Sequence, residues 1–122
     1  MSQLIFVTGA SSGIGQALAW RYYQAGYALA LVARRTDEMQ TWATQRGLDP
    51  ARYQIYSADV AEVDSIVAAA QLCLQRQGLP DVVIANAGVS IGMDTAVRED
   101  LAVMTRVFAI NNVGLAATFH AF

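Results

Sequence analysis

The stretch Val7-Thr8-Gly9-Ala10-Ser11-Ser12-Gly13-Ile14-Gly15 decides the fold of this chain. The apolar run that leads into it, residues 4–7, is too short for a helix and rich in residues that favour strands. Behind it, the helical spacing of Ile14, Ala17, Leu18, Arg21, Tyr22 and Ala25 predicts a helix with an apolar stripe. A strand therefore enters a glycine-rich turn that opens a helix, and this context separates a dinucleotide-binding turn from a chance cluster of glycines.

The glycines of this turn suit a bound phosphate. Gly9 lets the chain leave the strand through a tight turn in which φ can be positive. Gly13 and Gly15 lack side chains, so a pyrophosphate can approach the backbone and the helix can pack close to the sheet. Because the turn holds no Lys or Arg, we expect backbone N–H groups at the helix start and hydroxyl groups to hold the anion. The predicted cofactor-binding residues here are Gly9, Ser11, Ser12, Gly13, Ile14 and Gly15.

Three other interpretations of the turn were weighed. A P-loop requires Gly-Lys-Ser/Thr at its end, and this turn has no lysine. Residues 9–13 also satisfy G-x-S-x-G, the nucleophile elbow of α/β-hydrolases, but there an acid and then a histidine follow in chain order. The only histidine here is His120, at the very end, which disfavours that alternative. An ordinary strand-to-helix loop is the third alternative, and the three glycines in this context disfavour it.

Composition narrows the class of protein. The 122 residues favour one domain, 1–122, and the formal net charge of −2 argues against nucleic acid as a partner. Hydrophobic residues make up 55% of the chain, so we expect some apolar surface to meet a partner or a further part of the fold. No apolar run approaches the ~20 residues of a membrane span. The lone Cys73 allows no internal disulfide, which predicts a buried thiol and a cytoplasmic location.

The rest of the chain alternates strands with helices. Apolar runs at residues 28–33, 53–57 and 81–85 predict three further strands, the first of them buried on both faces. A helix is expected after each, with Thr36 as the N-cap of one, a stripe of Val63, Ile66, Val67, Ala70 and Leu74 in the next, and the last from about Thr95 to the end. This order predicts an α/β fold with a doubly wound parallel sheet and ligands at the carboxyl ends of its strands.

Each predicted strand ends in a distinctive group of residues. Arg34-Arg35 follows the second strand, where paired planar donors suit the 2′-phosphate of NADP, although two solvated arginines are an alternative. Asp59-Val60 closes the third strand, where the carboxylate can also help to start the next helix. Asn86-Ala87-Gly88 follows the fourth strand and indicates a turn.

The last predicted helix contains a polar residue in an apolar face. Its stripe holds Leu101, Met104, Phe108, Asn111, Leu115, Thr118 and Phe122. Burial of an amide without partners costs free energy, so Asn111 is expected to be a hydrogen-bonded core amide or a functional residue.

Taken together, Thr8-Gly9-x-x-x-Gly13-x-Gly15, Asp59-Val60, Asn86-Ala87-Gly88 and Ile110-Asn111-Asn112-Val113-Gly114 resemble the short-chain dehydrogenase/reductase family. The resemblance implies a Rossmann-like fold and places Asp59 and Val60 beside the adenine. It implies that the small residues of 86–88 let the ribose approach, and that Asn86 ties the sheet edge together. It gives Asn111 the role of holding a water in the proton relay. Ala33-Arg34-Arg35 looks like the NADP-preferring members.

The resemblance covers the N-terminal half of that family. The family's catalytic Ser and its Tyr-x-x-x-Lys motif lie after this helix, and the chain holds no lysine. Two hypotheses follow: an NADP-dependent oxidoreductase acting on a carbonyl or alcohol, represented by its N-terminal half, or a dinucleotide-binding module without chemistry. For the chain alone we expect no turnover, no metal, a sheet incomplete on its C-terminal side, and a homo-oligomer through the last helix.

Overall fold

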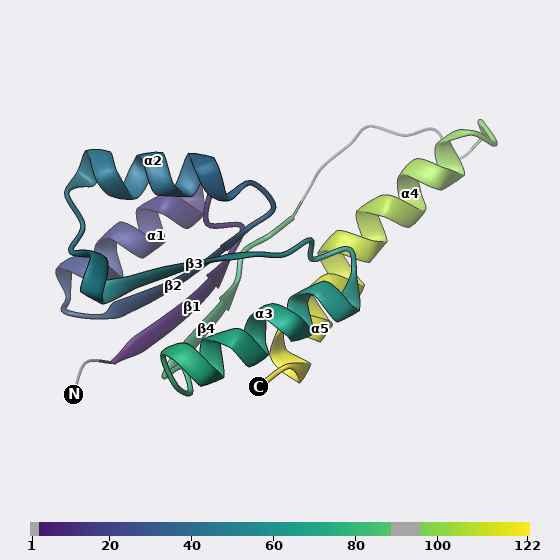
Figure 1. Ribbon diagram of the computed structural model, residues 1–122. Coiled ribbons are helices and arrows are strands. Elements are labelled where there is room, and N and C mark those ends of the chain that lie inside the picture. The colour runs from purple at the N-terminus through teal and green to yellow at the C-terminus, as the bar shows by residue number, and fades with distance from the viewer. Residues whose placement is uncertain (1–2, 89–95) are drawn as a thin grey trace.

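The computed structural model describes residues 3–88 and 96–122. Four strands, β1 (Leu4–Thr8), β2 (Ala28–Ala33), β3 (Tyr53–Ser57) and β4 (Val82–Ala85), form one parallel sheet with the order β3-β2-β1-β4 (Figure 1). The chain builds outward from β1 through β2 to β3, then crosses to the other side of β1 for β4. This is the predicted doubly wound parallel sheet, and the reversal of direction beside β1 creates the switch point where such folds bind ligands.

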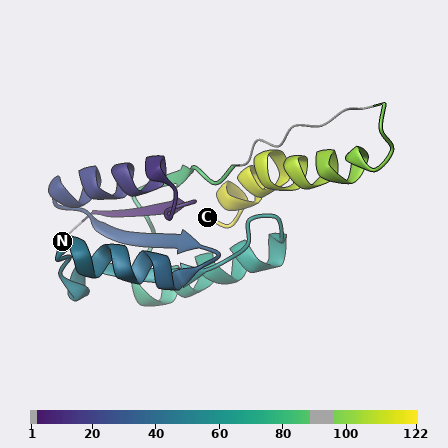
Figure 2. The same ribbon diagram turned by 90° about the horizontal axis from the view of Figure 1, so that it is seen from above.

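Helices cover both faces of the sheet. On one face lie α1 (Gly13–Gln24) and α2 (Thr36–Arg46), and on the other lie α3 (Val63–Arg76) and α5 (Leu115–His120) (Figures 1 and 2). A 3₁₀ turn, η1 (Pro50–Arg52), leads into β3. Alternation along β1 divides the core, because successive side chains of a strand point to opposite faces.

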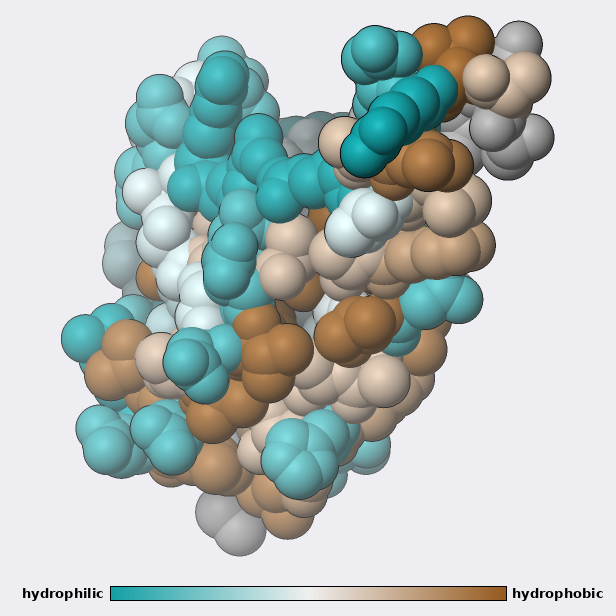
Figure 3. Space-filling view, turned by 90° about the vertical axis from the view of Figure 1, so that its right-hand side faces the viewer, coloured by the Kyte–Doolittle hydropathy of each residue, from teal (hydrophilic) through white to brown (hydrophobic). Residues whose placement is uncertain are grey.

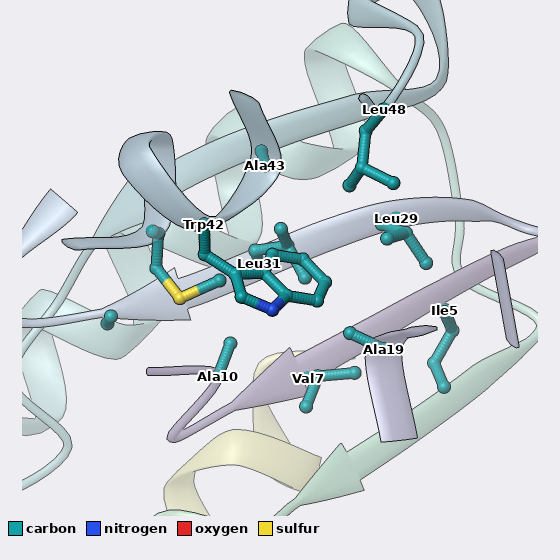
Figure 4. Close-up of a cluster of buried hydrophobic side chains, with 11 residues drawn as sticks. Ile5, Val7, Ala10, Ala19, Leu29, Leu31, Trp42, Ala43 and Leu48 are labelled. Atoms are coloured by element: carbon teal, nitrogen blue, oxygen red, sulfur yellow. The ribbon is translucent and has the colours of Figure 1, made fainter. Parts of the chain in front are cut away.

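The first core cluster fills the space between the sheet, α1 and α2. Trp42 reaches from α2 toward the sheet above Leu31 and Val7 (Figure 4). The fully buried Ile5 and Leu29 belong to the same cluster. β2 is buried on both faces, as its continuous apolar sequence predicted.

The second core cluster joins the opposite face of the sheet to α3 and α5. Phe6 is fully buried there and meets the ring of Phe122 edge to face, with 4.7 Å between ring centroids. Cys73 is fully buried, which confirms the prediction from its place in a helix. The Tyr56 hydroxyl donates to Gln77 Oε1 at 2.9 Å, which gives a buried polar group its partner.

The predicted stripe of α1 is wrong. Ile14 is 70% exposed, Ala17 and Ala25 are also exposed, and the buried residues are Gly15 and Ala19. α1 packs on the sheet through its smallest residues, which let the two backbones approach. The apolar residues therefore do not mark the buried face at this end of the helix.

Two other helix predictions need correction. Thr36 is the first residue of α2 and not its N-cap, a position that Arg35 occupies without a side-chain hydrogen bond. In α3, Val63 and Leu74 are 42% and 40% exposed, and the buried residues are Ile66, Ala69, Ala70 and Cys73. The buried stripe is thus narrower than predicted, and small residues fill half of it.

The terminal helix is continuous but not uniform. α4 (Asp100–Phe108) passes into a π-helical segment, η2 (Ala109–Gly114), and then into α5. Of the predicted apolar stripe, Leu101, Phe108 and Leu115 are 41–53% exposed, whereas Thr118 is buried and Phe122 packs on the second core cluster. The wider π turn rotates the helix, and the buried residues are Ile110, Gly114, Ala117 and Thr118. The predicted start at Thr95 lies outside the described residues.

Residues Asp100–His120 are also long and apolar enough to cross a membrane by length and composition, with a mean hydropathy of 1.3. The expected absence of a membrane span is therefore not confirmed. The core helix of a soluble protein passes the same test. Here Ala117 and Thr118 pack into the fold, and the Thr118 hydroxyl donates to Gly114 O at 2.8 Å.

Candidate functional site

An open cleft of about 860 Å³ lies at the carboxyl ends of the strands, where the predicted groups meet. Its walls come from all four strand ends and from α4 and η2. Of the predicted site residues it is lined by Gly9, Ser11, Ser12, Gly13, Ile14, Arg34, Arg35, Asp59, Val60, Asn86, Ala87 and Gly88. The two that do not line it are Gly15 and Asn111.

The glycine turn is held by a small hydrogen-bond network. Ser12 is the N-cap of α1, because its hydroxyl oxygen accepts from Gly15 N–H at 3.0 Å and its proton is donated to Gly9 O at 2.8 Å. Asn86 Nδ2 donates to Gly9 O at 3.2 Å and to Ser12 Oγ at 3.1 Å. Asn86 therefore fastens the end of β4 to the turn after β1, in agreement with the tie at the sheet edge that the family resemblance implied.

The three glycines of the turn serve different needs. Gly9 has a φ of +62°, and a Cβ there would lie 2.8 Å from the Ala87 Cα. A Cβ on Gly15 would collide with the Gly9 carbonyl oxygen, so Gly15 is required for packing. A Cβ on Gly13 would meet nothing within 4 Å, because Gly13 faces the open cleft at the start of α1.

Positive charge gathers where β2 ends. Arg34 and Arg35 are both exposed and line the cleft. Arg35 Nη1 lies 3.8 Å from Glu38 Oε1 on the first turn of α2. Glu38 also lines the cleft, and the sequence interpretation had not assigned it to the site. A carboxylate thus stands beside Arg35 at this end of the cleft.

Asp59 anchors the loop after β3. Its Oδ1 accepts from Ala61 N–H at 3.0 Å, and its own N–H donates to Ser65 Oγ at 3.0 Å. Asp59 Oδ2 lies 3.6 Å from Arg106 Nη2 of α4. The carboxylate therefore shapes the loop that leads into α3 and also lines the cleft, whereas the N-cap of α3 is Glu62.

Asn111 lies near the end of β4 without lining the cleft. A Cβ on Gly88 would be 3.2 Å from the Asn111 Oδ1, so the amide and the glycine are close neighbours. Asn111 is half-buried within η2, the π-helical segment. Gly114 lies so close to the Val60 carbonyl oxygen that a side chain there would collide with it. This approach brings η2 against the loop after β3.

The cleft supplies binding groups and few reactive ones. Helix N–H groups, guanidinium groups and the carboxylates of Glu38 and Asp59 line different parts of the cleft, and the N–H and guanidinium groups suit an elongated, anionic ligand. Among the described lining residues there is no Tyr, Lys, His or Cys. In residues 3–88 and 96–122, no group of three or more His, Cys, Asp or Glu side chains could hold a metal.

The sequence of this chain matches a known protein family and several of its members. The family model described as short chain dehydrogenase matches residues 3–122. A Drosophila melanogaster protein named "Dehydrogenase/reductase SDR family protein 7-like" is 37% identical over 109 residues, which cover 84% of this chain and 33% of that protein. The Arabidopsis thaliana "11-beta-hydroxysteroid dehydrogenase-like 3" is 39% identical over 88 residues, 71% of this chain and 28% of that protein. The chain thus spans about a third of these relatives.

Solved structures agree with the sequence relatives. An alcohol dehydrogenase from Thermococcus sibiricus, complexed with 5-hydroxy-NADP, has a TM-score of 0.87 and 30% identity over all of this chain and 52% of its own. A metagenomic short-chain oxidoreductase in complex with NADP has a TM-score of 0.87 and 28% identity, covering all of this chain and 56% of its own. From the match over residues 3–122 and these superpositions, we conclude that the chain belongs to the short-chain dehydrogenase/reductase family.

Proposed function

We propose that this chain is the cofactor-binding part of an NADP-dependent oxidoreductase that interconverts a small carbonyl compound and its alcohol. The main observation in support of NADP is that Arg34 and Arg35 line the same cleft as the glycine turn. Guanidinium groups suit a 2′-phosphate because their planar donors form paired hydrogen bonds with its oxygens. The two structural neighbours crystallised with NADP or 5-hydroxy-NADP lend support to this choice.

Each part of the cofactor has proposed partners along the cleft. The pyrophosphate is held by N–H groups at the start of α1, beside Gly13 and Ile14, with Ser11 at the same turn. The adenine lies against Asp59 and Val60 at the end of β3. The ribose toward the nicotinamide passes the small residues Ala87 and Gly88. Bound NADP supplies the hydride donor or acceptor, and the chain orients it.

Asn111 has a proposed role in proton transfer. Its amide lies next to Gly88, at the end of the cleft where β4 stops, and it sits in a π-helical segment. Such segments recur at functional sites because they present groups that a regular helix would pair internally. We assign to Asn111 the holding of a water that relays a proton.

Turnover by this chain alone is not expected. A positioned general acid contributes typically 10²–10⁴-fold to a rate, and the described cleft lining offers no Tyr, Lys or His for that role. The same observation is what a dinucleotide-binding module without chemistry would show, but the family match and the relatives named as dehydrogenases do not favour that alternative.

Two further proposals concern the oligomeric state and the cellular location of the protein. Exposed apolar side chains gather on the side of the molecule seen in Figure 3. The terminal helix exposes Leu101, Phe108, Leu115 and Phe119. We propose a homo-oligomer that covers this face, since soluble proteins rarely leave such patches open. The lone buried Cys73 supports a cytoplasmic location, where thiols stay reduced.

Cofactor preference tests the proposed function directly. We expect the protein to bind NADP about 10-fold or more tightly than NAD, because hydrogen bonds to charged groups contribute about 1.5–3 kcal/mol. Replacement of both Arg34 and Arg35 by Ala should weaken NADP binding and leave NAD nearly unchanged. Calorimetric titration measures both affinities, with Arg46→Ala, on the far end of α2, as the matched control. Equal affinities of the unmodified protein for the two cofactors would refute the NADP assignment.

A further inference from the structure

Arg106 extends from α4 to the adenine end of the cleft, where neither residue spacing nor motif had placed a functional residue. It lines the cleft together with Asp59, Val60 and Ile110. Its Nη2 lies 3.6 Å from Asp59 Oδ2, and the two side chains are 41% and 30% exposed. A donor and an acceptor from distant parts of the chain thus face each other beside an apolar wall.

The ion pair between Arg106 and Asp59 leaves hydrogen-bonding groups of both side chains available to a ligand. A hydrogen-bonded N–H···O pair has heavy atoms about 2.7–3.2 Å apart, and the separation here is longer. Asp59 Oδ1 is already occupied by Ala61 N–H, so Oδ2 is the oxygen that faces Arg106. The guanidinium group carries five N–H donors, and several can serve a ligand while the charge stays near the carboxylate.

We propose that Arg106 and Asp59 together read the edge of the adenine base, which makes Arg106 a specificity-determining residue of the cleft. This inference rests on the proposed function, because it requires an adenine dinucleotide in the cleft. Adenine presents an amino donor next to a ring-nitrogen acceptor. Asp59 Oδ2 accepts from the amino group, and an Arg106 N–H donates to the adjacent ring nitrogen. Val60 and Ile110 supply apolar surface for the faces of the base.

The arrangement rejects hypoxanthine. In that base a carbonyl oxygen replaces the amino group, and the adjacent N1 carries a hydrogen. The carbonyl oxygen would then face the Asp59 carboxylate, and the N1–H would face the Arg106 donors. Both hydrogen bonds are lost, and like partners meet in their place.

The experiment compares NADP with its hypoxanthine analogue, deamino-NADP, by calorimetric titration. The two ligands share every phosphate, so the ratio of their affinities reports on the base alone. We expect the unmodified protein to prefer NADP by about 10-fold, as one or two hydrogen bonds provide. Arg106→Leu should reduce the ratio at least about threefold, and Arg106→Lys should retain part of it because one N–H donor remains. Arg98→Leu, an exposed arginine just before α4, is the matched control and should leave the ratio unchanged.

The outcomes separate this inference from the proposed function. Equal affinity of the unmodified protein for both ligands would overturn the inference and leave NADP binding intact, and this measurement requires no variant. An undiminished ratio in Arg106→Leu would overturn the role of Arg106. Failure of the unmodified protein to bind either ligand would overturn the proposed function, and the inference with it.

Discussion

Gly13 and Gly15 stand two residues apart in the same turn, and their surroundings assign them different tasks. Gly13 opens onto the cleft, whereas any side chain on Gly15 would collide with the Gly9 carbonyl oxygen and crowd the Asn86 amide. We expect Gly13→Ala to leave stability unchanged or raise it by about 0.5–1 kcal/mol, as Gly-to-Ala changes in helices do. Gly13→Val should abolish dinucleotide binding in a folded protein, because the branched side chain occupies the space proposed for the pyrophosphate.

Gly15→Val should instead lower the unfolding temperature sharply, and lose binding together with the fold. Thermal unfolding followed by circular dichroism, with cofactor titration of the same samples, distinguishes the two residues. Full cofactor affinity in Gly13→Val would show that the pyrophosphate does not lie at this turn. Sequence reasoning identified both glycines, but it could not separate their roles, since the collision of Gly15 depends on how closely α1 approaches β1.

At the scale of elements, the contact between α3 and the sheet buries two ionisable groups, the Cys73 thiol of α3 and the Tyr56 phenol of β3. Burial raises the pKa of the Cys73 thiol to about 11, and burial together with the neighbouring Cys73 raises the pKa of the Tyr56 phenol. Each group is neutral when protonated, so a raised pKa in the folded state means that the native protein holds its proton more tightly than the unfolded chain. This contribution to stability is complete below the unfolded pKa of about 9 and is lost as pH rises toward 11.

We therefore expect the free energy of unfolding to fall above pH 9, by up to about 1.4 kcal/mol per pH unit for Cys73 alone. Cys73→Ala should flatten this fall, although it costs some packing at every pH. Urea denaturation at pH 8, 9, 10 and 11 measures both slopes. Identical slopes for the two proteins between pH 9 and 11 would contradict the assignment to Cys73.

Elements were easier to predict than their buried faces. Alternating apolar runs and turn residues located all four described strands to within one residue, since β1 and β2 are buried throughout and their sequences show it. The buried face of α1 differs from the predicted stripe, and in the terminal helix only part of the apolar stripe is buried, for a shared reason. Where backbones pack closely, Gly15 and Gly114 lie at the contact, and larger apolar residues such as Ile14 and Phe108 remain exposed.

The same contrast holds for the site. Residues that follow strand ends, such as Arg34 and Asp59, lie in the cleft because parallel strands bring their carboxyl ends to one edge. Glu38 and Arg106 reach the same cleft from helices, and nothing in their local sequence indicates it. Their positions follow from how α2 and α4 pack, which a single sequence does not encode in any short pattern.

At the scale of the whole molecule, two surfaces of the described chain lack cover. β4 pairs only with β1 among the described strands, and each of its apolar residues is half-exposed. The terminal helix exposes Leu101, Phe108, Leu115 and Phe119. An unpaired strand edge and an apolar helix face both promote association.

We expect the 122-residue chain to sediment as dimers or larger species in analytical ultracentrifugation. The double variant Phe108→Glu with Leu115→Glu should shift the chain toward monomer. A monomeric unmodified chain would contradict this prediction.

The absence of a proton donor from the described cleft lining gives the last prediction. The tyrosines are the candidates by chemistry, but none of them lines the cleft. Tyr56 is buried against Gln77, Tyr22 and Tyr23 lie in the last turn of α1, Tyr27 follows that helix, and Tyr53 begins β3 at the end of the strand away from the cleft. We expect the 122-residue chain to bind NADP and to oxidise NADPH with ketones or aldehydes no faster than the reaction without protein. The measurement follows NADPH absorbance over a panel of carbonyl compounds, with the metagenomic short-chain oxidoreductase as positive control. Turnover at a rate comparable to that enzyme's would mean that a proton donor outside the described lining reaches the substrate, and Asn111→Ala would then show whether the relay passes through that amide.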